Sequence, residues 1–103
     1  MEAFKIAILK QTLEMQENIR TGFIDIYNGP NEMFEKILTL HLPFYNDVSV
    51  QTSTHKAVIK FAIIPYQTQE YFQMYIRLDR VFVITEKKEF NSIITSNVEF
   101  NWL

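Results

Sequence analysis

The chain has 103 residues, a net charge of −2 and no cysteine, and 48% of its residues are hydrophobic. This length fits one domain spanning residues 1–103 and leaves no room for two. The lack of cysteine excludes a disulfide framework, a thiolate metal site and a cysteine nucleophile. The charge is neither the strongly basic balance of a dedicated DNA binder nor the strongly acidic balance of a DNA mimic.

Residues 2–20 are predicted to form a helix. Phe4, Ile8 and Met15 share one side of a helical projection, and the segment is rich in Gln, Glu, Lys and Leu, which are good helix formers. A strand over AFKIAIL is the competing interpretation, because Phe4, Ile6 and Ile8 also alternate. We favour the helix because the segment continues into KQTLEMQENI, which has poor strand composition.

A second helix is predicted for residues 30–42, after a short strand or extended link at residues 23–27. The NGP break at residues 28–30 supplies a turn and a proline suited to a helix start. Phe34, Ile37, Leu38 and His41 then form one stripe at helical spacing, and a proline follows at position 43.

From Asp47 onward the hydrophobic period changes to two, which is typical of strands. The predicted strands cover residues 48–54, 57–64, 70–78, 81–86 and 97–103, and one long bent strand through residues 70–86 is an alternative to two. Because helices come first and strands follow, we expect an α+β fold in which N-terminal helices pack on an antiparallel sheet or on a small, partly open barrel. A PUA-like barrel, a small fold often used for RNA binding, would accommodate this order by analogy.

The predicted core combines large apolar side chains from both halves of the chain. Its members are Phe4, Ile8, Phe34, Ile37, Leu38, Ile59, Phe61, Ile63, Phe72, Met74, Ile76, Phe82, Ile84, Phe100 and Trp102.

The sequence contains no motif that indicates catalysis, and we expect neither a metal nor another cofactor. His41 and His55 lie far apart, and neither has a carboxylate at a metal-binding spacing. Two acidic pairs occur at helical spacing, Glu14 with Glu17 and Glu32 with Glu35. Both pairs lie on polar helix faces, which is typical of solvated surfaces. We therefore expect a regulatory binding module rather than an enzyme, which ranks third among the candidate functions.

The stretch EYFQMYIRLDR, residues 70–80, carries the main functional hypothesis. Its apolar residues alternate with Tyr71, Tyr75 and Arg77, so these three side chains share the second face of a predicted strand. If Lys60 and Arg80 lie nearby, the face combines aromatic rings with cations. Such surfaces stack unpaired bases and bind phosphate, so RNA or other single-stranded nucleic acid is the predicted partner. An ordinary half-exposed sheet surface is the simpler alternative.

Protein–protein contact is the alternative function. Trp102, within VEFNWL, is predicted either to complete the core or to meet a partner, and an exposed strand edge would allow a homodimer. We expect a cytoplasmic protein without a membrane segment, since no apolar run approaches the roughly 20 residues that span a bilayer. The Ile-, Asn- and Lys-rich composition resembles that of small accessory proteins of low-GC bacteria, their phages and plasmids.

Overall fold

The computed structural model describes the backbone of residues 4–67, 71–78, 81–87 and 94–101, and the side chains of residues 4–67 and 73–78. Within these residues the protein consists of eight strands and one short helix. In chain order these are β1 (Lys5–Ile8), α1 (Leu13–Asn18), β2 (Ile19–Tyr27), β3 (Lys36–Leu42), β4 (Val48–Gln51), β5 (Lys56–Pro65), β6 (Tyr71–Arg77), β7 (Val81–Lys87) and β8 (Ile94–Asn101).

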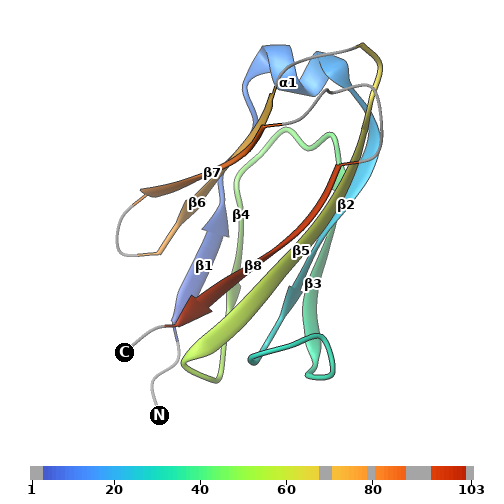
Figure 1. The fold of residues 1–103 in the computed structure, drawn as a ribbon. Coiled ribbons are helices and arrows are strands. Elements are labelled where there is room, and N and C mark those ends of the chain that lie inside the picture. Colours follow the sequence, from blue (N-terminus) through green and yellow to red (C-terminus); the bar gives the residue numbers. More distant parts are fainter. Residues whose placement is uncertain (1–3, 68–70, 79–80, 88–93, 102–103) are drawn as a thin grey trace.

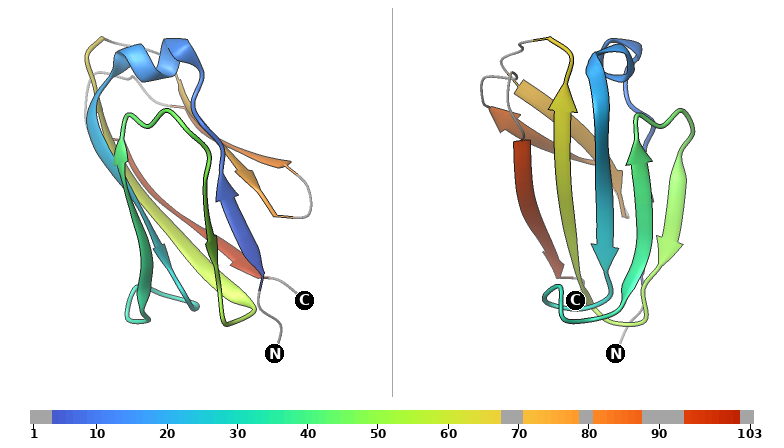
Figure 2. Two further views of the ribbon diagram at one scale, coloured as in Figure 1. Left: turned by 180° about the vertical axis from the view of Figure 1, so that it is seen from behind. Right: turned by 90° about the vertical axis from the view of Figure 1, so that its right-hand side faces the viewer.

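The strands form two four-stranded antiparallel sheets, with the order β4-β1-β6-β7 in sheet A and β3-β2-β5-β8 in sheet B. The sheets face each other as a sandwich, and α1 crosses from one to the other at one end (Figures 1 and 2). The β2–β3 and β6–β7 connections stay within one sheet, whereas the other connections between consecutive strands cross between the sheets.

The core lies between the two sheets, because alternate strand residues point inward. Ile6 and Ile76 from sheet A and Ile24 and Phe61 from sheet B are each 0% exposed and belong to one hydrophobic cluster. Burial of both inner faces against each other is the stabilising arrangement that defines a β-sandwich.

The predicted α+β fold is wrong at the N-terminal segment. Residues 5–8 form β1, and helix is confined to Leu13–Asn18. Ile6 and Ile8 are both 0% exposed, and β1 pairs with β4 on one side and β6 on the other. The alternating pattern that favoured the strand was therefore the relevant one, and sheet pairing overrides the helix propensity of this segment.

The second predicted helix, over residues 30–42, is also wrong. Residues 36–42 form β3, which pairs with β2 across a loop at residues 28–35. Phe34, predicted to be in the core, lies in that loop and is 47% exposed. Ile37 and Leu38 remain partly buried against the core. Residues 34, 37, 38 and 41 satisfied a helical period by coincidence, because a short apolar run fits both periods.

The strands predicted after residue 47 are confirmed in outline, since β4, β5, β6, β7 and β8 all fall within or overlap the predicted segments. The sheet or barrel expected to support N-terminal helices is replaced by two separate sheets. Seven predicted core residues are buried: Phe4, Ile8, Ile59, Phe61, Ile63, Met74 and Ile76. The side chains of Phe72, Phe82, Ile84, Phe100 and Trp102 lie outside the described part of the structure.

Candidate functional site

The strand β6 shows the predicted alternation. Met74 and Ile76 are 2% and 0% exposed and point into the core, whereas Tyr75 is half-buried and Arg77 is exposed. Tyr75 and Arg77 therefore lie on the outer face of sheet A, as the period of two predicts.

Antiparallel register identifies the neighbours of Tyr75 and Arg77 on this face. Ala7 of β1 is paired with Arg77 on one side and with Ser49 of β4 on the other. Leu9, just after β1, donates its backbone N–H to the carbonyl oxygen of Tyr75 at 3.0 Å. We call this surface face A and define it by Lys5, Ala7, Ser49, Gln51, Gln73, Tyr75 and Arg77.

Face A is cationic among the side chains that the structure describes. Its charged members are Lys5 and Arg77, and none of its seven residues is acidic. The carboxylate of Asp47, just before β4, accepts a hydrogen bond from the backbone N–H of Lys10 at 2.7 Å. Ala7 lies beside Arg77 in register, and Ser49 lies on the other side of Ala7, so the side chains next to Arg77 across β1 and β4 are small.

The ring of Tyr75 is held in place on face A. Its hydroxyl group donates a hydrogen bond to the side-chain oxygen of Gln73 at 3.2 Å. Residues two apart on a strand share one face, so this contact links neighbours along β6. A ring held in this way loses less conformational freedom when a ligand packs on it.

Lys60 lies apart from Tyr75 and Arg77. It belongs to β5 in sheet B, whereas β6 belongs to sheet A, so the two strands are not adjacent in one sheet. Its ammonium group forms an ion pair with the carboxylate of Glu32 at 3.0 Å. The hydrogen bond and the charge of Glu32 raise the pKa of Lys60 above its ordinary value of 10.5.

Three other predicted site residues receive no side-chain placement. Tyr71 begins β6, and its backbone is paired with Lys87 of β7, but its side chain is outside the described part. Arg80 and Trp102 lie outside the described residues altogether. Of the predicted cluster, the structure thus places Tyr75 and Arg77 on one sheet face, on which Lys5 also lies.

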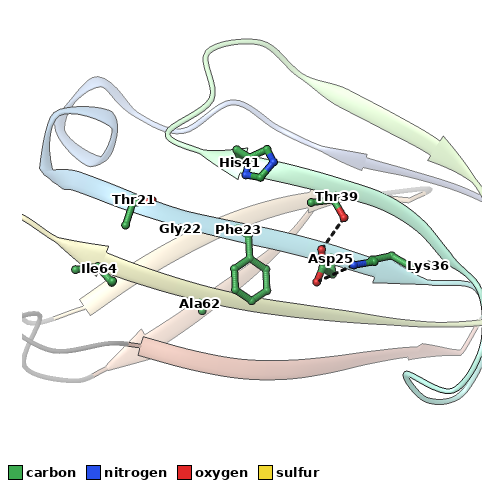
Figure 3. A pocket seen from close by; sticks show the side chains of 9 residues that line it. All are labelled: Thr21, Gly22, Phe23, Asp25, Lys36, Thr39, His41, Ala62 and Ile64. Carbon is green, nitrogen blue, oxygen red and sulfur yellow. Dashed lines mark hydrogen bonds and ion pairs between the residues drawn. The ribbon is translucent and has the colours of Figure 1, made fainter.

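The outer face of sheet B carries a shallow hollow of about 490 Å³ that the sequence did not predict (Figure 3). It spans β2, β3 and β5 and is lined by Thr21, Gly22, Phe23, Asp25, Lys36, Thr39, His41, Ala62 and Ile64. Register explains the grouping, because His41, Phe23 and Ala62 are partners across three adjacent strands. Phe23, Ala62 and Ile64 give the hollow an apolar surface.

Asp25 is the unusual residue of this hollow, because it is 8% exposed although it lies on the outer side of the sheet. One carboxylate oxygen, Oδ1, accepts a hydrogen bond from the Thr39 hydroxyl group at 2.9 Å. The other, Oδ2, lies 3.8 Å from the Lys36 ammonium group, which is beyond hydrogen-bonding distance. The alternation of residues 23–27 could have placed Asp25 outward, but it carries no signal for burial.

The two histidines do not form a metal site. His41 is exposed on β3 and lines the hollow, rather than lying on the apolar stripe of a helix, and His55 lies in the connection between β4 and β5. Among the described residues, no group of three or more His, Cys, Asp or Glu side chains is arranged to hold a metal ion.

Comparison with known proteins gives no assignment: no family model, curated protein or solved structure matches the chain. Within the described residues, no helix has the length and apolar character needed to span a bilayer.

Proposed function

We propose that the chain is a small non-catalytic binding module that binds single-stranded RNA on face A. The observation that carries the proposal is that Tyr75 lies on the same sheet face as two cations, Lys5 and Arg77, and that none of the seven residues that define this face is acidic. The nearest described carboxylate along β4 is that of Asp47, which accepts a hydrogen bond from the backbone N–H of Lys10. Sheet surfaces of this kind bind RNA by stacking bases on aromatic rings and pairing phosphates with cations. The overall net charge of −2 is compatible with this, because the field near a face depends on the local charges.

Described acidic residues in sheet B and in the loop between β2 and β3 support the same choice of face. Glu32 is paired with Lys60, and Asp25 lies near Lys36. These carboxylates would repel phosphate, so the outer side of sheet B is the poorer surface for RNA. The proposed RNA interface therefore consists of Tyr75, Arg77 and Lys5, and it no longer includes Lys60. Tyr71 and Arg80 remain part of the hypothesis through their sequence positions.

Fluorescence anisotropy with pools of short, labelled single-stranded RNA at low salt tests the proposal. We expect weak binding that weakens further as salt rises. Tyr75→Ala should weaken binding by about 1–3 kcal/mol if its ring stacks a base, and Arg77→Ala should lower the salt slope by about one phosphate contact. Tyr66→Ala is the matched control, because Tyr66 is 67% exposed but lies in the β5–β6 connection.

Two results would contradict this function. The first is no detectable binding by the wild-type protein at low salt. The second is binding that Tyr75→Ala and Tyr66→Ala weaken equally, since the ring on face A would then have no special role. Lys60→Ala distinguishes binding on sheet A from binding on sheet B. A loss of RNA affinity as large as that of Arg77→Ala would assign the RNA to sheet B instead.

A protein-interaction subunit is the second candidate, and the edge of sheet B favours it. The seven-residue strand β3 is paired with β2 on one side, and within the described residues no strand pairs with its other side. Free edges of this length can pair with a strand of another chain, including a second copy. Sedimentation velocity over a range of micromolar concentrations tests the homodimer, which a constant monomer would exclude.

The cytoplasm is the compartment that we propose for either function. The basis is the sequence, which contains no cysteine that an oxidising compartment could crosslink.

A further inference from the structure

We propose that the hollow on sheet B binds a small amphipathic ammonium compound, with its cationic group on Asp25 and its apolar part against Phe23, Ala62 and Ile64. This site lies on the opposite sheet from face A and does not depend on the RNA proposal. The assignment follows from the fixed carboxylate, the apolar surface beside it and the competing lysine.

The carboxylate of Asp25 is held in place but incompletely paired. Asp25 is 8% exposed, and Thr39 fixes its Oδ1 atom through a 2.9 Å hydrogen bond. No hydrogen bond reaches Oδ2 within the described residues, and the nearest cation, Lys36, lies at 3.8 Å. Lys60, the register partner of Asp25 on β5, is paired with Glu32 instead. A largely buried carboxylate is stabilised by a closer charged donor, because desolvation of the charge is otherwise only partly offset. A ligand ammonium group supplies that donor.

The surface beside Asp25 suits an apolar body. Phe23 is the register neighbour of Ala62, and Ile64 lies two residues further along β5, so the three share the outer face. Figure 3 shows the Phe23 ring on the β5 side of β2, with Asp25 further along the same strand. A cation beside an aromatic ring also gains a cation–π contribution. The volume of about 490 Å³ is in the range of small-molecule sites.

Charge decides in favour of a cation over an anion. Lys36 has a side chain that is 46% exposed, whereas the Asp25 side chain is 11% exposed. A half-exposed lysine can move its ammonium group into water at little cost, since surface ion pairs contribute little. The buried carboxylate has no such alternative. A ligand cation therefore displaces Lys36 from Asp25, whereas a ligand anion would be repelled by a carboxylate that cannot move away.

Phenethylamine is the probe, and two-dimensional amide NMR of the full chain is the readout. We expect saturable shifts of amide signals in β2, β3 and β5 around Asp25. Phenylacetate, which has the same ring and the opposite charge, should give no saturable shifts there. Asp25→Asn keeps the acceptor for Thr39 and removes the charge, so it should weaken phenethylamine binding at least about tenfold. Glu14→Gln, at an exposed carboxylate on α1 outside the hollow lining, is the matched control and should leave affinity unchanged.

Lys36→Met provides a second, opposite test that does not depend on the fold of the Asp25 variant. It removes the competing cation and should tighten phenethylamine binding several-fold. Loss of binding in Lys36→Met, or phenylacetate binding at least as tight as phenethylamine, would overturn the proposal by assigning the hollow to anions. Equal affinity of the Asp25→Asn variant and the wild type would overturn it as well, as would the absence of saturable shifts with phenethylamine.

Discussion

At the scale of single residues, Gly22 shows how closely two strands of sheet B approach. It belongs to β2 and is paired with Ile63 of β5. A Cβ atom at this position would lie 2.6 Å from the backbone carbonyl oxygen of Ala62 and 3.1 Å from a methyl carbon of Leu42. The requirement for glycine here comes from the space available and not from a left-handed backbone, since no described glycine has a positive φ.

We expect Gly22→Ala to lower the free energy of unfolding by about 1–3 kcal/mol, because the clash is with backbone that cannot rotate away. Gly29→Ala is the matched control. Its added Cβ would meet the ring and the Cβ atom of Phe34, but both residues lie in the exposed loop between β2 and β3, where a small shift disturbs no strand pairing. Urea denaturation followed by circular dichroism measures the free energy of unfolding of both variants. A Gly22→Ala variant as stable as Gly29→Ala would show that β2 and β5 can separate slightly without cost.

The sequence predicted the candidate site only where the alternation of side chains along a single strand determines which residues share a face. The period of two placed Tyr75 and Arg77 together on one face, and the structure agrees. It could not say which strand lies next to β6, so Lys60 was grouped with them although the two strands belong to different sheets. Strand order depends on long-range packing, which a local pattern does not contain. The burial of Asp25 is missing from the sequence pattern for the same reason.

At the scale of elements, Asn18 fixes the position of α1, which has only six residues. Its side-chain amide donates to the carbonyl oxygen of Gln67 at 3.0 Å and accepts from the backbone N–H of Gln67 at 2.8 Å. Its own carbonyl oxygen accepts from Tyr66 at 2.7 Å. A helix this short is not stable alone, so these bonds to the β5–β6 connection determine where it lies.

Asn18→Ala should therefore lower the free energy of unfolding by about 1–3 kcal/mol, because it leaves both backbone groups of Gln67 without their partner. Near neutral pH, the free energy of unfolding of Asn18→Asp should lie between those of Asn18→Ala and the wild type. The aspartate carboxylate can still accept a hydrogen bond from the Gln67 N–H but cannot donate one. Thermal unfolding by circular dichroism gives the order of the three proteins. If Asn18→Ala unfolds at the same temperature as the wild type, water replaces these hydrogen bonds and α1 is positioned by its apolar contacts alone.

The secondary-structure predictions were wrong where a short apolar run fits both the helical period of 3.6 and the strand period of two. Residues 4–8 and 34–42 each matched a helix stripe and a strand alternation. Their strand conformation follows from pairing with partners far along the chain, as Ile6 pairs with Val50 and Leu40 with Ile24. After residue 47 the alternation is longer and contains more β-branched residues, so local pattern and tertiary pairing agree.

At the scale of the whole molecule, the two sheets are held together by one core. Side chains from both sheets that are 0% exposed belong to the same cluster, including Ile8 and Ile76 from sheet A and Ile59 and Phe61 from sheet B. Most connections cross from one sheet to the other. Neither sheet can therefore bury its apolar face without the other, and the protein should unfold in one cooperative transition.

Phe61→Ala tests this cooperativity, because the ring is 0% exposed in the middle of β5. Truncation of a buried Phe should lower the free energy of unfolding by about 3–5 kcal/mol, a large part of the about 5–15 kcal/mol typical of a small domain. Phe34→Ala, at a side chain that is 47% exposed, is the matched control and should cost about 1 kcal/mol or less. Amide exchange in β1 should accelerate in Phe61→Ala as much as exchange in β2, although β1 belongs to the other sheet, because both sheets open together. Acceleration confined to sheet B would show instead that the two sheets unfold separately and that the shared core does not couple them.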